Sequence, residues 1–137
     1  MTQVILSTRQ AVLQPINGDY RGKDIVSLEQ FSVEDLQTLF TVTQYMKRLV
    51  LKNEPSQLLA GQLIALLFFE ASSRTFGSFA AAVKRLGGQT LEMQNPETVS
   101  SIYKGESFED TIRVFEAYCN AIVLRHYQVG AAKQLWN

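Results

Sequence analysis

The sequence predicts a doubly wound α/β domain, in which helices cover both faces of a mainly parallel sheet to give three layers. Apolar runs of strand length alternate with segments of helical periodicity along most of the 137 residues. The run from Leu63 to Phe69 is apolar at every position, which is typical of a strand covered on both faces, as in parallel sheets. Apolar residues make up 46% of the chain and charged residues 19%, the composition of an ordinary globular domain.

The first 22 residues show no sustained periodicity. Pro15, Gly18 and Gly22 interrupt them, and these residue types favour turns. We therefore expect residues 1–22 to form an N-terminal arm with at most one short helix, and residues 23–137 to form the domain.

A long amphipathic helix is predicted after the arm. Ser32 is followed three residues later by Asp35, a spacing that resembles a capping box at a helix start. Apolar side chains then recur at helical spacing, at Leu36, Leu39, Phe40, Met46, Leu49 and Val50. The prediction is one helix from about Val33 to Leu51, with a break at Pro55.

Strands and helices alternate in the remainder of the chain. We expect, in order, a buried strand over residues 63–69, a helix over 75–86, a short strand over 90–93, a helix over 106–118 and a buried strand over 121–124. Gly87-Gly88 is a standard stop for the first of these helices. Ligands of such folds lie beyond the carboxyl ends of the strands, so the site is expected there.

Polar residues follow two of the three predicted strands. The first strand runs through Glu70 into Ser72-Ser73-Arg74-Thr75 and directly into a helix, and the third ends in Arg125-His126. Hydroxyls and backbone N–H groups at a helix N-terminus, with a guanidinium, form a site for a phosphate-sized anion. A simpler interpretation stays open, because serines and threonines before a helix are usually caps and an arginine in a first turn is usually solvated.

Charge and composition argue against several classes of protein. Thirteen basic and thirteen acidic residues cancel, so no global field holds nucleic acid or an anionic membrane. No apolar run approaches the roughly 20 residues that span a bilayer, and the N-terminus lacks a signal pattern. Cys119 is the single cysteine, which excludes an internal disulfide and fits a reducing compartment. We expect a cytoplasmic protein with no nucleic-acid or membrane partner.

The polar segment resembles the signature of the aspartate/ornithine carbamoyltransferase family. Phe68 to Thr75, followed by a helix closing in Leu86-Gly87-Gly88, is similar to Phe-x-x-x-Ser-Thr-Arg-Thr and a helix ending in Leu-Gly-Gly. Three details favour the aspartate type: Glu70, the stretch Ser100 to Ser107, which resembles a mobile loop of that family, and Leu124-Arg125-His126. The resemblance extends over nearly the whole chain from residue 22 to residue 135 and implies its N-terminal, carbamoyl-phosphate-binding domain.

The resemblance implies roles for individual residues. The expected carbamoyl phosphate contacts are Ser72, Ser73, Arg74, Thr75, Arg125, Ser100 and Lys104. Of these, Ser100 and Lys104 would enter the site of an adjacent subunit, which implies a homotrimer with shared active sites. Glu70 matches a carboxylate that pairs with arginines of a second domain during closure.

The implied reaction is carbamoyl transfer to L-aspartate, a step of de novo pyrimidine biosynthesis. The amine attacks the carbamoyl carbon, charge builds on the carbonyl oxygen and phosphate departs, so the reaction needs preorganised positive groups rather than a protein nucleophile. The expected catalytic residues are Arg74, Thr75, Arg125 and Lys104, with no metal and no organic cofactor.

The chain departs from the family pattern at a few positions and in its extent. Ser73 replaces the usual threonine, Ala71 stands where proline is common and Phe76 where arginine is common. Family members continue with a His-Pro-x-Gln element and a second domain that binds aspartate. Because this sequence ends at Asn137, we expect that domain to be absent and the chain to be inactive alone, with L-aspartate bound only together with the missing domain.

Alternatives to the catalytic interpretation stay open. One is a non-catalytic phosphate-binding module or a trimer-forming structural or regulatory partner; a more distant one is an ornithine carbamoyltransferase fragment. His126 is interpreted as structural or peripheral, because a single histidine without an acid partner is a weak candidate for a general base. Cys119 is interpreted as a small core residue.

Overall fold

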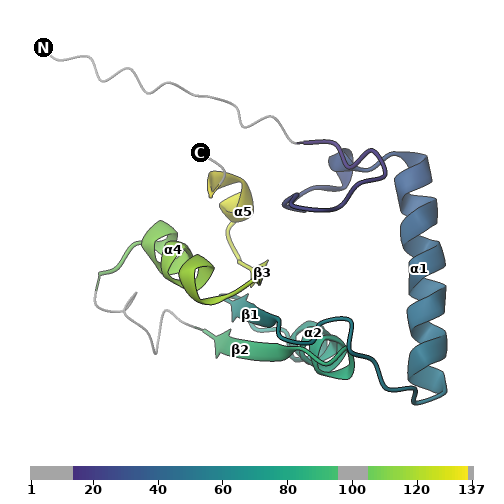
Figure 1. Ribbon diagram of the computed structural model, residues 1–137. Coiled ribbons are helices and arrows are strands. Elements are labelled where there is room, and N and C mark those ends of the chain that lie inside the picture. The colour runs from purple at the N-terminus through teal and green to yellow at the C-terminus, as the bar shows by residue number, and fades with distance from the viewer. Residues whose placement is uncertain (1–13, 96–104, 136–137) are drawn as a thin grey trace, which may run out of the picture. The chain divides into compact units, whose positions relative to one another are not determined.

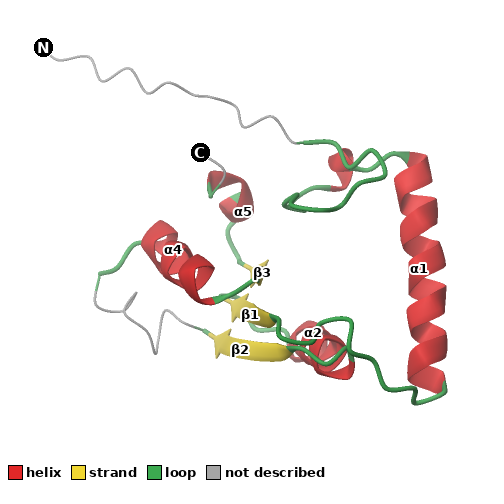
Figure 2. Cartoon of the chain, viewed as in Figure 1, coloured by secondary structure: helices red, strands yellow, loops and turns green. Residues whose placement is uncertain are grey.

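The computed structural model describes residues 14–95 and 105–135. The chain divides into two compact units, one from Lys47 to Val129 and one that combines Met1–Met46 with Gly130–Asn137. The elements, shown in Figures 1 and 2, are the 3-10 helix η1 (Leu28–Gln30), α1 (Val33–Leu51), β1 (Leu63–Phe68), α2 (Ser73–Arg85), β2 (Gln89–Gln94), α4 (Phe108–Tyr118), β3 (Ala121–Arg125) and α5 (Ala131–Gln134).

The sheet lies in the unit from Lys47 to Val129 and is parallel throughout. Its strand order is β2-β1-β3, so β1 is the central strand. Four consecutive β1 residues, from Ala65 to Phe68, have no exposed surface. This burial on both faces explains why the run is apolar at every position. The predicted α/β fold with a parallel sheet is confirmed.

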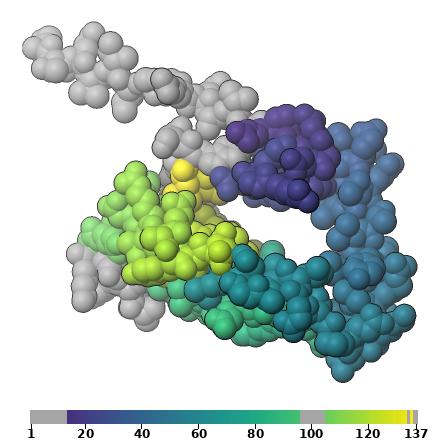
Figure 3. Space-filling model, viewed as in Figure 1, coloured from purple at the N-terminus to yellow at the C-terminus, as the bar shows by residue number. Residues whose placement is uncertain are grey.

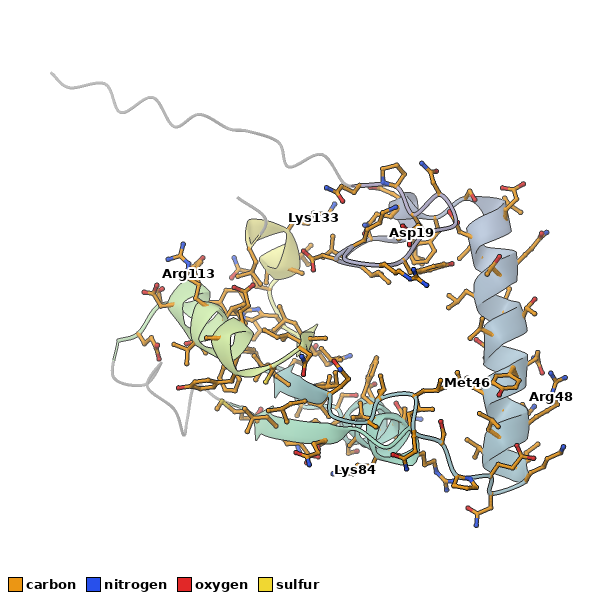
Figure 4. All side chains as sticks on the ribbon, viewed as in Figure 1. Asp19, Met46, Arg48, Lys84, Arg113 and Lys133 are labelled. Atoms are coloured by element: carbon orange, nitrogen blue, oxygen red, sulfur yellow. The ribbon has the colours of Figure 1, made fainter. Side chains whose placement is uncertain are left out.

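Helices cover β1 from both sides. Ile64, Leu66 and Phe68 form a buried cluster with Val83 of α2 and with Phe76, whose ring meets that of Phe68 edge to face at 5.1 Å. The residues that alternate with these point to the other face of the sheet. On that face Phe69, which directly follows β1, lies edge to face with Phe108 of α4, with ring centroids 5.2 Å apart. Because successive side chains of a strand point to opposite faces, α2 and α4 lie on opposite faces of the sheet. In the space-filling view this part of the chain is one continuous body of teal and green (Figure 3).

The connections create a topological switch point. The chain leaves β1, passes through α2 on one face to β2, and returns through α4 on the other face to β3 on the far side of β1. The carboxyl ends of β1 and β3 therefore flank the position where the winding reverses, which is where doubly wound folds bind ligands.

The capping box predicted at Ser32 is confirmed at the start of α1. The Asp35 N–H donates to Ser32 Oγ at 3.1 Å, and the Ser32 N–H donates to Asp35 Oδ2 at 2.9 Å. Gly18, from the segment predicted as an arm, donates its N–H to Asp35 Oδ1 at 2.7 Å, and the Asp35 side chain is almost wholly buried. The backbone N–H groups of Ser32 and Gly18 hold the pKa of Asp35 below its ordinary value, although burial opposes them.

The side chain of Gln30, in η1, holds the segment before α1 together through hydrogen bonds to its backbone. Its side chain is buried, with 2% of its surface exposed, and makes four hydrogen bonds. Oε1 accepts from the N–H groups of Val26 and Ser27 at 2.9 and 3.0 Å, and Nε2 donates to the carbonyls of Gln14 and Asp24 at 3.0 and 2.8 Å. All four groups of the amide are therefore satisfied, as a buried polar side chain requires.

Several differences between prediction and structure lie at element ends, and the strand predicted as buried over residues 121–124 is only half-buried, with Ala121 exposed. The bounds predicted for α1 match, whereas α2 begins at Ser73, earlier than the predicted start at Thr75. α4 begins at Phe108 rather than Glu106, because Ser107 is its N-cap and accepts from the Asp110 N–H. The short helices η1 and α5 were not predicted. Within residues 14–95 and 105–135, no helix has the length and apolar character to cross a membrane.

Candidate functional site

Two charged residues meet at the switch point. Glu70 follows β1 and Arg125 ends β3, where it lies opposite Phe68 in the sheet register. Arg125 Nη2 and Glu70 Oε2 are 2.9 Å apart, and the two side chains are 38% and 46% exposed. The Phe69 N–H donates to the Arg125 carbonyl at 2.8 Å, which extends the β1–β3 pairing and holds the backbone of the arginine in the sheet.

The guanidinium of Arg125 retains a donor. Its Nε is buried and has no hydrogen-bond partner among the described residues. Buried polar atoms are nearly always paired, which makes this unpaired donor at the switch point a candidate contact for a bound group. A planar guanidinium with an open donor suits phosphate or carbonyl oxygens.

The N-terminus of α2 is open on the same edge of the sheet. Ser72 occupies the N-cap position, but its side chain makes no capping bond. Its hydroxyl instead donates to Thr75 Oγ1 at 2.9 Å, and its carbonyl accepts the Phe76 N–H at 2.9 Å. The first N–H groups of a helix have no partner within the helix, and Ser72 does not supply a side-chain cap, so those of the first turn here lack both an intrahelical partner and a cap among the described residues. The simpler interpretation is therefore wrong for the Ser72 hydroxyl, which does not cap the helix, whereas Arg74 is exposed as that interpretation expects.

The predicted anion-binding residues fall into two groups. Ser72, Ser73, Arg74 and Thr75 form the N-cap and first turn of α2, with Ser73 and Arg74 exposed and Ser72 and Thr75 half-buried. Arg125 and Glu70 form the ion pair at the ends of the neighbouring strands. Ser100 and Lys104 lie outside the described residues. Within the described ranges, no group of three or more His, Cys, Asp and Glu side chains is arranged to hold a metal ion.

His126, interpreted from the sequence as structural or peripheral, packs among three aromatic side chains. Its ring lies against Phe69, Phe108 and Tyr127, with centroid distances of 4.9, 4.8 and 4.4 Å. The sequence signal that could have shown this is the placement of an aromatic residue after β1, at the start of α4 and next to the histidine. Cys119 is half-buried at the end of α4, and burial raises the pKa of its thiol.

Fold and site together define the class of the protein: a doubly wound α/β domain with an uncapped helix N-terminus and an arginine at its switch point. The chain belongs to the aspartate/ornithine carbamoyltransferase family. The sequence model described as "Aspartate/ornithine carbamoyltransferase, carbamoyl-P binding domain" matches residues 23–137.

Several relatives are named as aspartate carbamoyltransferases. The chain is 41% identical over 129 residues to aspartate carbamoyltransferase 1, chloroplastic, of Pisum sativum, covering 94% of this chain and 33% of the relative. It is 40% identical over 114 residues to the aspartate carbamoyltransferase catalytic subunit of Methanosarcina mazei, covering 83% and 37%. The chain thus spans about a third of the length of these relatives.

Solved structures show the same similarity. Aspartate transcarbamoylase from Trypanosoma cruzi, crystallised in complex with carbamoyl phosphate, superposes with a TM-score of 0.80 and 41% identity over 90% of this chain and 39% of that one. The catalytic subunit of aspartate transcarbamoylase from M. jannaschii gives a TM-score of 0.74 and 38% identity over 82% of this chain and 36% of that one.

Proposed function

We propose that this chain is the carbamoyl-phosphate-binding part of an aspartate carbamoyltransferase, which forms N-carbamoyl-L-aspartate and phosphate for de novo pyrimidine biosynthesis. The observation that carries the proposal is the juxtaposition of the uncapped α2 N-terminus and Arg125 at the switch point. Family membership and the similarity to an enzyme crystallised with carbamoyl phosphate support the choice of ligand.

The first turn of α2 is the proposed phosphate cradle. Its free N–H groups and the positive end of the helix dipole favour a dianion. Arg74 is exposed on this turn and adds a guanidinium that can bind two phosphate oxygens at once. The phosphate would thus be held by backbone and side-chain donors that are in place before the ligand arrives.

Thr75 and Arg125 are the proposed donors to the carbonyl oxygen. The Thr75 hydroxyl accepts from Ser72, so its own proton is left to donate, and accepting a bond strengthens it as a donor. Arg125 contributes a guanidinium whose Nε has no hydrogen-bond partner among the described residues. Two preorganised donors at the oxygen where charge develops are worth a few kcal/mol each in the barrier.

Completion of the active site is proposed to need other chains or domains. L-aspartate would bind through the second domain, with Glu70 exchanging Arg125 for the arginines of that domain on closure. Ser100 and Lys104 would come from an adjacent subunit of a homotrimer. On this proposal the chain alone binds carbamoyl phosphate and does not turn it over.

The test is isothermal titration of the purified chain with phosphonoacetamide, a stable mimic of carbamoyl phosphate. We expect the wild type to bind and Arg74→Ala to lose most of the affinity, while Arg85→Ala, which removes the same charge from the other end of α2, binds like the wild type. Absence of binding by folded wild-type chain, or equal loss in both variants, would overturn the proposal.

A further inference from the structure

His126 is held in one orientation by groups from three parts of the fold. Phe69 follows β1, Phe108 is the first residue of α4, and Tyr127 follows the histidine itself. The His126 ring is tilted against Phe69 at 4.9 Å, edge to face with Phe108 at 4.8 Å and stacked on Tyr127 at 4.4 Å. Three ring contacts leave the imidazole little freedom to rotate.

One ring nitrogen is committed to the backbone. Nδ1 of His126 accepts the Gln128 N–H at 2.9 Å. A nitrogen that accepts carries no proton, so the neutral imidazole has its hydrogen on Nε2. The bond closes a turn directly after Arg125, the last residue of β3.

Hydrogen bonds hold the backbone on both sides of Arg125. Arg125 is held before it by the bond from the Phe69 N–H to its carbonyl, and the chain is held after it by the His126–Gln128 bond. Phe108, on which the His126 ring also packs, starts the helix that follows the stretch containing Lys104 in the sequence. The histidine thus joins the end of β3 to the start of α4 and to the end of β1.

We propose that His126 is a positioning residue: its Nδ1, unprotonated and bonded to the Gln128 N–H, sets the backbone after β3 so that Arg125 meets the bound anion. The inference rests on the proposed function, because it assumes that Arg125 contacts the ligand. On this inference His126 acts through Arg125 rather than by contacting the ligand.

Two substitutions distinguish the role of Nδ1 as a hydrogen-bond acceptor from the role of the His126 ring in packing. His126→Phe keeps an aromatic ring among Phe69, Phe108 and Tyr127 and removes Nδ1. His126→Asn removes the ring and places an amide oxygen near the position of Nδ1, where asparagine accepts a bond from the N–H two residues later. A residue with only a packing role would tolerate phenylalanine better than asparagine; a residue that acts through Nδ1 shows the reverse order.

The experiment is titration of the 137-residue chain with phosphonoacetamide, with circular dichroism to show that each variant is folded. We expect His126→Phe to weaken binding about five- to tenfold, the loss of one hydrogen bond, and His126→Asn to stay within about twofold of the wild type. Equal affinities for wild type and His126→Phe, or equal losses in both variants, would overturn the inference while leaving the proposed function intact. No binding by the wild type would overturn the proposed function and the inference with it.

A second measurement decides the case in which His126→Phe does not fold. The ¹⁵N shifts of His126 in the wild-type chain report which nitrogen carries the proton. A proton on Nε2 with Nδ1 as acceptor supports the inference; a proton on Nδ1 would overturn it.

Discussion

Replacing Glu70 by glutamine is expected to raise the affinity of the chain for phosphonoacetamide. In the structure the Glu70 carboxylate occupies one side of the Arg125 guanidinium, with Nη2 and Oε2 2.9 Å apart. An incoming anion has to approach the Arg125 guanidinium beside the Glu70 carboxylate, which carries a like charge. Glutamine keeps the shape of the side chain and removes the charge, so the arginine becomes more available.

The size of the expected gain in affinity follows from the solvent exposure of the Glu70–Arg125 ion pair. Both side chains are more than a third exposed, at 38% and 46%, so solvent screens the interaction as at a protein surface. Exposed pairs contribute about 0.2–1 kcal/mol, which corresponds to an affinity gain of about 1.5- to fivefold. The gain should shrink as salt is added, since screening weakens the pair in the wild type.

Isothermal titration of wild type, Glu70→Gln and Glu116→Gln at low and high ionic strength measures this effect. Glu116 is an exposed residue of α4, so its substitution makes the same change in net charge away from the ion pair. Unchanged or weaker binding by Glu70→Gln at low salt would refute the reasoning that Glu70 competes with the ligand for Arg125. An equal gain in Glu116→Gln would show a general charge effect instead.

Two further predictions concern the segment before α1 and the first turn of α1. Gln30→Leu leaves the N–H groups of Val26 and Ser27 without their acceptor, so it should lower the free energy of unfolding, measured in urea titrations, by about 2–4 kcal/mol. The control Gln37→Leu, on the exposed surface of α1, should change the free energy of unfolding little. Equal effects of the two substitutions would contradict the role of the buried amide. The pKa of Asp35 is lowered in the folded chain, so its contribution to stability is present above its unfolded value of about 3.9 and is lost as pH falls through the lower folded value. Thermal unfolding of wild type and Asp35→Asn between pH 6 and pH 2 tests this: the difference between them should narrow with acid, and a constant difference would contradict it.

The sequence alone determined the elements that depend on neighbours in the chain. The bounds of α1 were predictable because the capping box joins Ser32 to Asp35, three residues apart, and the apolar spacing continues to Leu51. The strand character of β1 was predictable because a strand buried on both faces has no room for a polar side chain. The polar residues that follow the strands were predictable for the same reason, since they stand out against the apolar runs.

The tertiary structure decided which of these residues meet. Glu70 and Arg125 form a pair only because β3 returns to lie beside β1, and periodicity within each strand carries no information on strand order. The same return places the ring of His126 against the rings of Phe69 and Phe108. That the Ser72 hydroxyl turns to Thr75 rather than capping α2 was also not readable, because a serine before a helix is compatible with either bond. Residue type and spacing predict local hydrogen bonds and burial, because these depend on neighbours in the chain. Contacts between distant segments depend on which helices and strands pack on each side of β1, and this is decided only in the tertiary structure.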